Sequence, residues 1–204
     1  MKSDKRLIRQ PIQTNTSPQL AAASFRRHGK TTLWIGYVLP ISVYASVVLF
    51  APLDVLDQFP ALRYWSDWVR GLLLTAAGNV DIYRHARSTT FPQVAMFTSA
   101  LGVSVAWFIA IATIIQGLIN YKHIASLDAE LSLKDRLVRV FLLPLFGLVC
   151  MWAFFCIRGD PSFAAGLTTQ SRSGYLFIST IAVLAFGGGV GIWPSSARHL
   201  FSVN

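Results

Sequence analysis

The stretch Val94–Ile119, VAMFTSALGVSVAWFIAIATIIQGLI, decides the fold class of this chain. Its 26 residues carry no charge and show no strand-like alternation, and a helix that crosses a bilayer needs only about 20 residues. Three further apolar stretches accompany it, at 33–53, 140–157 and 175–193. Within hydrocarbon, backbone N–H and C=O groups must be satisfied inside the segment, which favours helices. The sequence therefore predicts an all-α membrane protein with four transmembrane helices.

The composition of the whole chain agrees with a fold exposed to lipid. Apolar residues make up 53% of the 204 residues, and the mean hydropathy is +0.50. Only 13% of the residues are charged, against about 25% in soluble domains. The net charge of +9 comes from cations beside the apolar runs, where membrane topology and anionic lipid explain them better than nucleic acid does. We therefore expect the lipid bilayer, and no nucleic acid, as a partner.

One membrane domain between two tails is the expected organisation. Residues 1–32 hold seven basic residues and one acid, so we expect a disordered, basic cytoplasmic tail, with an organellar transit peptide as the alternative. Residues 33–198 are expected to form a single four-helix domain, and residues 199–204 a short C-terminal tail. No short apolar core with a cleavage site follows the first basic residues, so the first span is expected to stay as an anchor.

The longest connection between spans, residues 54–90, contains a predicted amphipathic helix at about 60–77. Pro60 suits the first helical position, and apolar and charged side chains lie on opposite faces. The apolar face carries Leu62, Trp65, Val69, Leu72 and Ala76, and the charged face carries Arg63, Asp67 and Arg70. Such a helix, with Trp65 and Trp68, is expected to lie in the membrane interface. The alternative is a helix that packs on the spans without touching lipid.

Proline, serine and glycine mark the other helices. Pro40 lies inside the first span, where it removes a backbone hydrogen bond and should kink the helix. Ser132 followed by Asp135 fits a capping box ahead of the third span. In the fourth span, Gly187 and Gly191 have the GxxxG spacing that lets helices approach closely. We expect this pair to serve internal helix packing, with a homo-oligomer seam as the alternative.

Orientation follows from the basic residues, which favour the cytoplasmic side. With a cytoplasmic N-terminus, that side carries twelve basic residues, including all five lysines, and the opposite side carries six. The sequence therefore predicts a multi-pass protein of a bacterial-type cytoplasmic (inner) membrane, with both termini in the cytoplasm.

The four spans contain no Asp, Glu, Lys, Arg or His. Proton relays, ion-coupled carriers and intramembrane metal sites usually place such groups at depth. Cys150 and Cys156 fall on different faces of one helix, and they predict neither a mutual disulfide nor a metal site. We therefore expect no catalytic residue, no cofactor and no bound metal.

The most concentrated polar patch contains Asp81, Arg84, His85 and Arg87, and is expected on the non-cytoplasmic side. In a helix, Asp81 and His85 would share a face and could pair. Arg84 and Arg87 would then be free to bind an anionic group. Together with the two tryptophans named above, these residues form the candidate site for a protein partner or for lipid headgroups.

The leading hypothesis is a non-enzymatic protein that acts by helix packing and partner binding. It would be an accessory or assembly subunit, or an immunity-type protector against a membrane-inserting toxin. The alternative is a small channel or carrier for a neutral solute, as an oligomer, whose path would involve Gln116, Gly188 and helices broken at Pro40 and Pro144. A lipid-directed enzyme, the third class, would need its catalytic groups between residues 81 and 90.

Overall fold

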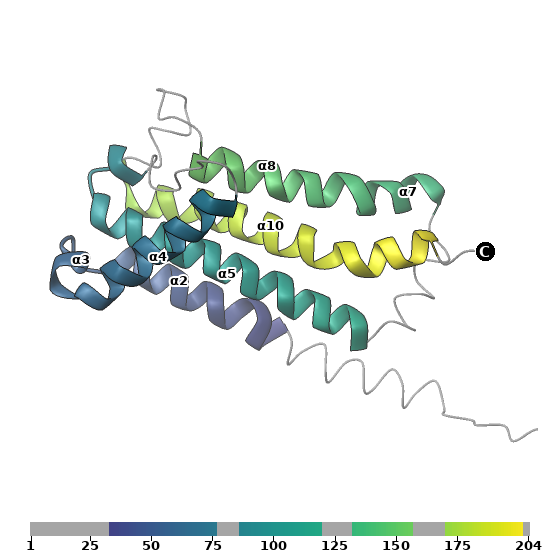
Figure 1. Cartoon of the computed structure of the whole chain (residues 1–204), viewed down its shortest axis with the longest axis horizontal. Coiled ribbons are helices and arrows are strands. Elements are labelled where there is room, and N and C mark those ends of the chain that lie inside the picture. Colours follow the sequence, from purple (N-terminus) through teal and green to yellow (C-terminus); the bar gives the residue numbers. More distant parts are fainter. Residues whose placement is uncertain (1–32, 77–85, 120–131, 157–169, 202–204) are drawn as a thin grey trace, which may run out of the picture.

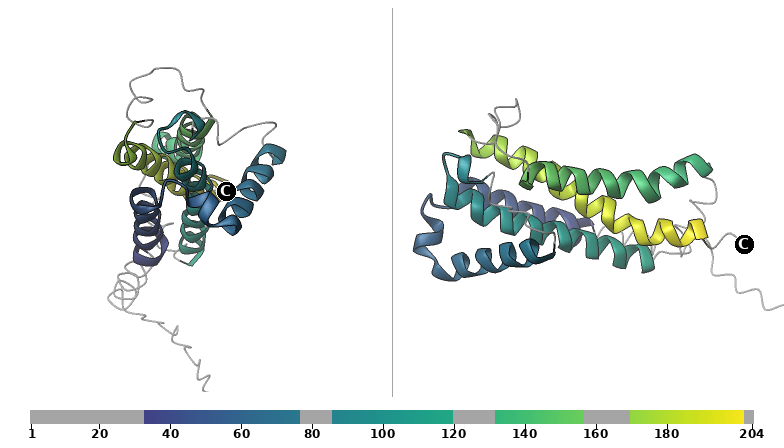
Figure 2. Two further views of the ribbon diagram at one scale, coloured as in Figure 1. Left: turned by 90° about the vertical axis from the view of Figure 1, so that its left-hand side faces the viewer. Right: turned by 45° about the horizontal axis from the view of Figure 1, so that its top comes forward.

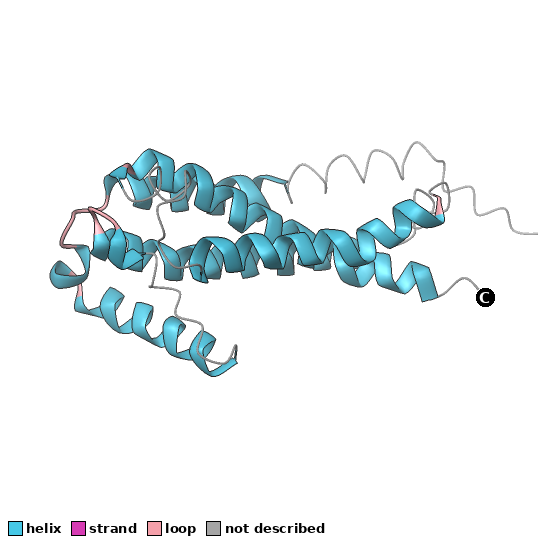
Figure 3. Cartoon of the chain, turned by 90° about the horizontal axis from the view of Figure 1, so that it is seen from above, coloured by secondary structure: helices cyan, strands magenta, loops and turns pink. Residues whose placement is uncertain are grey.

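The computed structural model describes residues 33–76, 86–119, 132–156 and 170–201, and within them the chain is 92% helical without a strand (Figures 1 and 3). The predicted all-α class is therefore confirmed. The long helices are α2 (Leu39–Phe50), α5 (Pro92–Ile119), α8 (Leu143–Cys156) and α10 (Arg172–Phe201). The shorter elements are α3 (Val55–Gln58), α4 (Pro60–Ala76), the 3-10 turn η2 (Ala86–Ser88) and α7 (Leu133–Leu137).

The long helices run side by side, in the order α8, α10, α5, α2 across the bundle (Figure 1). The most extensive contacts join α10 to α5 and α10 to α8, and α2 packs against both α5 and α10. Side chains of α5, together with Tyr44 and Val48 from α2 and Tyr175 and Val183 from α10, form the buried core. The end of the bundle where α2 ends and α5 and α10 begin is called the loop end below.

Two of the described helices, α5 and the Arg172–Pro194 part of α10, are long and apolar enough to cross a membrane. The sequence predicts four such helices, so two of the predicted spans differ from expectation. The first is shorter than predicted, because the helix covers only Trp34–Phe50 and the chain then turns at residues 51–54. The third is divided, because α8 has 14 residues and follows a turn of different geometry.

A π-helical turn precedes both α2 and α8, each of which carries a proline at its second residue. η1 (Trp34–Val38) precedes α2, and the Leu39 N–H donates to the carbonyl oxygen five residues back. Pro40 follows directly. A second π turn, η3 (Val138–Leu142), stands in the same position before Pro144. A proline ring crowds the carbonyl four residues back in a regular helix, and a π turn changes the spacing of the carbonyls at that point. The expected break at Pro40 therefore takes the form of a π turn.

Glycines set the distance between α10 and its neighbours. A Cβ atom at Gly187 would lie 2.6 Å from Ile109 Cγ2, and one at Gly191 would come within 2.5 Å of α5. Gly189 faces the opposite neighbour, because a Cβ there would lie 2.5 Å from the Leu143 carbonyl oxygen of α8. Real Cβ atoms essentially never approach below 3.0 Å, so a larger residue would force the helices apart. The GxxxG pair thus lies in a contact inside the molecule, on the face that a homodimer seam would need.

The amphipathic helix is present as α4, and it folds back beside the N-terminal half of α5 instead of lying across the end of the bundle (Figures 1 and 2). Trp65 packs edge-on against Phe97 of α5, with ring centroids 5.9 Å apart. Ser66 and Val69 are buried on the same side. One face of α4 therefore packs on α5, a predicted span, and contact of its other face with lipid stays a prediction.

Candidate functional site

The candidate residues divide between described and undescribed parts of the chain. Asp81, Arg84 and His85 lie outside the described residues, and so does their expected pairing. Arg87 is exposed in η2. Trp65 and Trp68 are described: Trp65 packs on α5, whereas Trp68, three residues further along α4, is 55% exposed. Of the two tryptophans assigned to the candidate site, Trp65 is thus partly buried and Trp68 is exposed.

A stripe of exposed apolar side chains runs along the outer side of α4. Tyr64 is 77% exposed, Trp68 is 55% exposed and Leu72 is 50% exposed. They follow one another at a spacing of four residues, so they share one helix face. The sequence assigned Leu72 to the apolar face together with Trp65 and Val69, and in the structure its side chain is half exposed. We call Tyr64, Trp68 and Leu72 the α4 stripe.

A polar clasp holds α3 and α4 against the start of α5. Gln93 Oε1 accepts hydrogen bonds from the backbone N–H groups of Leu56, at 3.0 Å, and Asp57, at 3.3 Å. Gln93 Nε2 donates to Asp57 Oδ2 at 2.5 Å, and Arg63 pairs with the other carboxylate oxygen. An exposed ion pair alone contributes little, but the amide also satisfies backbone donors. The clasp therefore fixes the direction in which the loop leaves the bundle.

Arg172 closes the loop end from the other side. Its Nη1 atom donates to the carbonyl oxygens of Leu49, at 2.9 Å, and Ala51, at 2.7 Å. Leu49 lies in the last turn of α2 and Ala51 is its C-cap residue, and at a helix C-terminus backbone acceptors have no partner within the helix and the helix dipole favours a cation. The start of α10 is thereby tied to the end of α2. Neither Arg172 nor Gln93 was singled out from the sequence, because nothing near them in the chain indicates partners so far away.

Hydroxyl groups inside the bundle bind mainly to helix carbonyls. Tyr175 Oη lies 3.0 Å from Ser99 Oγ and donates to the Ala95 carbonyl oxygen at 3.2 Å. Ser99 Oγ donates to the same carbonyl at 2.6 Å, and Thr98 Oγ1 donates to the Val94 carbonyl oxygen at 2.7 Å. Such bonds are the usual state of serine and threonine in apolar helices. They join α5 to α10, and they provide no base that could activate a hydroxyl as a nucleophile.

Among the described residues, no group of three or more His, Cys, Asp or Glu side chains lies where it could hold a metal ion. Comparison of the chain with protein families, with curated proteins and with solved structures finds no match. The candidate functional site is therefore the loop end. Its distinctive features are an exposed aromatic stripe and the polar clasp that holds it in place.

Proposed function

We propose that the chain is a non-enzymatic, multi-pass protein of a cytoplasmic membrane that binds a protein partner through the α4 stripe. In this proposal four segments cross the membrane: Trp34–Phe50, α5, the segment from η3 through α8, and α10. Both termini lie in the cytoplasm, and the loop end faces the opposite side. The partner would be the complex of which this chain is an accessory or assembly subunit, or a membrane-inserting toxin against which it protects.

Exposed apolar side chains on the flanks of the bundle support the membrane placement. On α8 these include Leu145, Phe146, Leu148 and Trp152, and on α5 they include Ile111 and Ile115. Monomeric soluble proteins rarely expose contiguous apolar patches larger than a few hundred Å². A bilayer would cover these flanks, and the short helices beside α5 and α10 would share the same slab through bilayer thinning and polar residues at their ends.

The length of α5 supports a loop end that stands outside the hydrocarbon. α5 has 28 residues, so at 1.5 Å per residue it is about 42 Å long. The hydrocarbon core is only about 30 Å thick. The part of α5 that exceeds the hydrocarbon core lies at the loop end in this proposal. Asp57, Arg63 and Asp67 lie there, and charged side chains avoid hydrocarbon. The start of the α4 stripe, at Tyr64, would then lie at the level of the headgroups, where a protein can reach it.

The single observation that carries the docking proposal is the exposure of three large apolar side chains on α4, next to the side chains that pack on α5. Trp65 and Val69 are already used by α5, so they explain why α4 folds. Tyr64, Trp68 and Leu72 are not needed for that contact and stay exposed. Tyrosine and tryptophan are the side chains that contribute most to protein interfaces. The clasp gives the stripe a fixed orientation, which reduces the entropy lost on binding.

A photo-crosslinking experiment tests this proposal. A photoreactive amino acid is placed at Tyr64, Trp68 or Leu72 in native membranes, and the adducts are identified by mass spectrometry. We expect the same protein to be captured from all three positions, and the yield from Tyr64 to fall when Trp68→Ala is added, because an interface aromatic typically contributes about 2 kcal/mol or more.

Phe177 is the matched control, because it is an exposed aromatic residue near the start of α10 on another element. A photoreactive group there should capture lipid and not the partner, and Phe177→Ala should leave the crosslink from Tyr64 unchanged. Adducts with lipid alone at all three positions of the α4 stripe would contradict docking through α4.

A further inference from the structure

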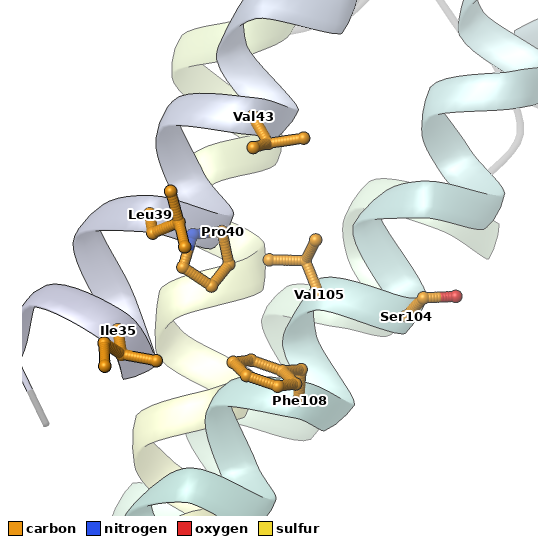
Figure 4. A pocket seen from close by; sticks show the side chains of 7 residues that line it. All are labelled: Ile35, Leu39, Pro40, Val43, Ser104, Val105 and Phe108. Carbon is orange, nitrogen blue, oxygen red and sulfur yellow. The ribbon is translucent and has the colours of Figure 1, made fainter.

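An apolar groove lies between the start of the first helix and the middle of α5 (Figure 4). Its volume is about 380 Å³. Ile35, Leu39, Pro40 and Val43 line one wall, and Ser104, Val105 and Phe108 line the other. The Pro40 ring on one side, and the Val105 and Phe108 side chains on the other, point into the space between the two helices (Figure 4).

Contacts with α5 and with the core fix the first helix on either side of Pro40. Tyr37 Oη is hydrogen-bonded to Thr113 Oγ1, which ties η1 to α5. About two and three turns further along, Tyr44 and Val48 are fully buried in the core. Pro40 lies between these contacts, and it lines the groove.

The groove offers its occupant apolar contact and no polar partner. Six of its seven lining residues are apolar or proline. The seventh, Ser104, uses its hydroxyl to donate to the Ala100 carbonyl oxygen of its own helix at 3.0 Å. A polar ligand would leave its own groups unsatisfied there. The chemistry of the lining thus selects a hydrocarbon chain.

The length of the groove and the charges near it indicate where the hydrocarbon chain comes from. From Ile35 to Val43 the wall is about 12 Å long at 1.5 Å per residue, close to the ~15 Å depth of one leaflet. The sequence places Arg26, Arg27 and Lys30 within the nine residues before Ile35, and basic residues at a membrane surface attract anionic headgroups. We propose that the groove binds an acyl chain of an anionic phospholipid of the cytoplasmic leaflet, an inference that rests on the membrane placement proposed above.

Photoreactive lipids test this site. The full chain is reconstituted into vesicles with a trace of phosphatidylglycerol, or of phosphatidylcholine, that carries a photoreactive group in one acyl chain. Adducts are then mapped to peptides. We expect phosphatidylglycerol adducts to concentrate on residues 35–43 and 104–108, about fivefold above phosphatidylcholine adducts, the ratio that one basic side chain near an anionic headgroup gives.

Two matched variants separate the groove from lipid contact in general. Val43 is 50% and Val149 51% exposed, and only Val43 lines the groove. Val43→Trp should fill the groove and remove the excess of adducts, whereas Val149→Trp on α8 should leave it unchanged. Equal labelling of α8 and the groove, equal labelling by the two lipids, or an excess that survives Val43→Trp would overturn the proposal.

A separate measurement shows which proposal has failed if the groove is not labelled. The reconstituted chain is washed at alkaline pH, which removes peripheral proteins from vesicles. If the chain is washed off, the membrane placement is wrong and the lipid site falls with it. If the chain is retained and the groove is not labelled, only the lipid site is wrong.

Discussion

Two tyrosines in the core differ in the surroundings of their hydroxyl groups. Tyr44 and Tyr175 both have 0% of their surface exposed. Tyr175 Oη bonds to Ser99 and to the Ala95 carbonyl oxygen, and its ring packs edge-on against Phe91. Tyr44 Oη makes no hydrogen bond of good geometry among the described residues, and its interaction with the Ser179 hydroxyl is the weaker kind. A buried hydroxyl without a partner is destabilising, whereas a bonded one contributes modestly to stability.

Removing each hydroxyl should therefore have opposite effects. Tyr175→Phe should lower the free energy of unfolding by about 1 kcal/mol, because the hydrogen bond that the Tyr175 hydroxyl donates inside the core is lost. Tyr44→Phe should leave it unchanged or raise it. Reversible unfolding in mixed detergent micelles measures both. A loss for Tyr44→Phe as large as that for Tyr175→Phe would mean that Tyr44 does have a partner, such as a buried water molecule.

The element that determines the packing is α10, whose three successive glycines have three different surroundings. Gly187 faces α5 and Gly189 faces the backbone of α8, whereas a Cβ at Gly188 would meet no atom within 4 Å. The sequence GGG alone does not distinguish the three positions. Their roles follow from the angle of about 100° between successive residues of a helix, together with helices on two sides of α10.

Alanine substitutions at these three positions should differ in their effect on the free energy of unfolding. Gly187→Ala and Gly189→Ala should each lower the free energy of unfolding by about 1–3 kcal/mol, because the added methyl group forces packed helices apart. Gly188→Ala should be neutral or stabilising, because alanine favours the helix by up to about 1 kcal/mol over glycine. Unfolding in detergent micelles checks all three. Three equal effects would contradict the packing described here.

Single elements could be predicted from the sequence where the signal is local. The helix predicted at 60–77 is α4, at Pro60–Ala76, and the span predicted at 94–119 is α5, at Pro92–Ile119. The predicted cap is present too, since Ser132 Oγ accepts from the Asp135 N–H at 3.2 Å. The span predicted at 175–193 corresponds to Arg172–Pro194, and the helix α10 continues beyond this span to Phe201.

Contacts between distant parts of the chain could not be predicted in this way. Gln93 lies directly before the predicted span at 94–119, and its bonds to Leu56 and Asp57 depend on the direction in which α3 leaves α2. Arg172 was counted only for its charge, yet it binds carbonyls more than 120 residues earlier. Trp65 and Trp68 are the same residue type in the same predicted helix, and only the position of α5 decides which of them is the more buried.

At the scale of the whole molecule, the account depends on how many times the chain crosses the membrane. Length and composition alone identify α5 and α10 as candidate spans. With only these two crossings, Lys134 and Ser173 would lie on one side of the membrane and Gln58 on the other. With four crossings, Gln58 and Ser173 would share a side and Lys134 would lie opposite them. All three side chains are exposed, so each can be labelled.

The most direct measurement is therefore the labelling of single cysteines at these positions in intact cells. Cys150 and Cys156 are first replaced by serine, and Gln58→Cys, Lys134→Cys and Ser173→Cys are each treated with a maleimide that cannot cross the membrane. The account predicts labelling of Gln58→Cys and Ser173→Cys from outside, and of Lys134→Cys only after the membrane is permeabilised. Labelling of Lys134→Cys and Ser173→Cys on the same side, opposite Gln58→Cys, would contradict it.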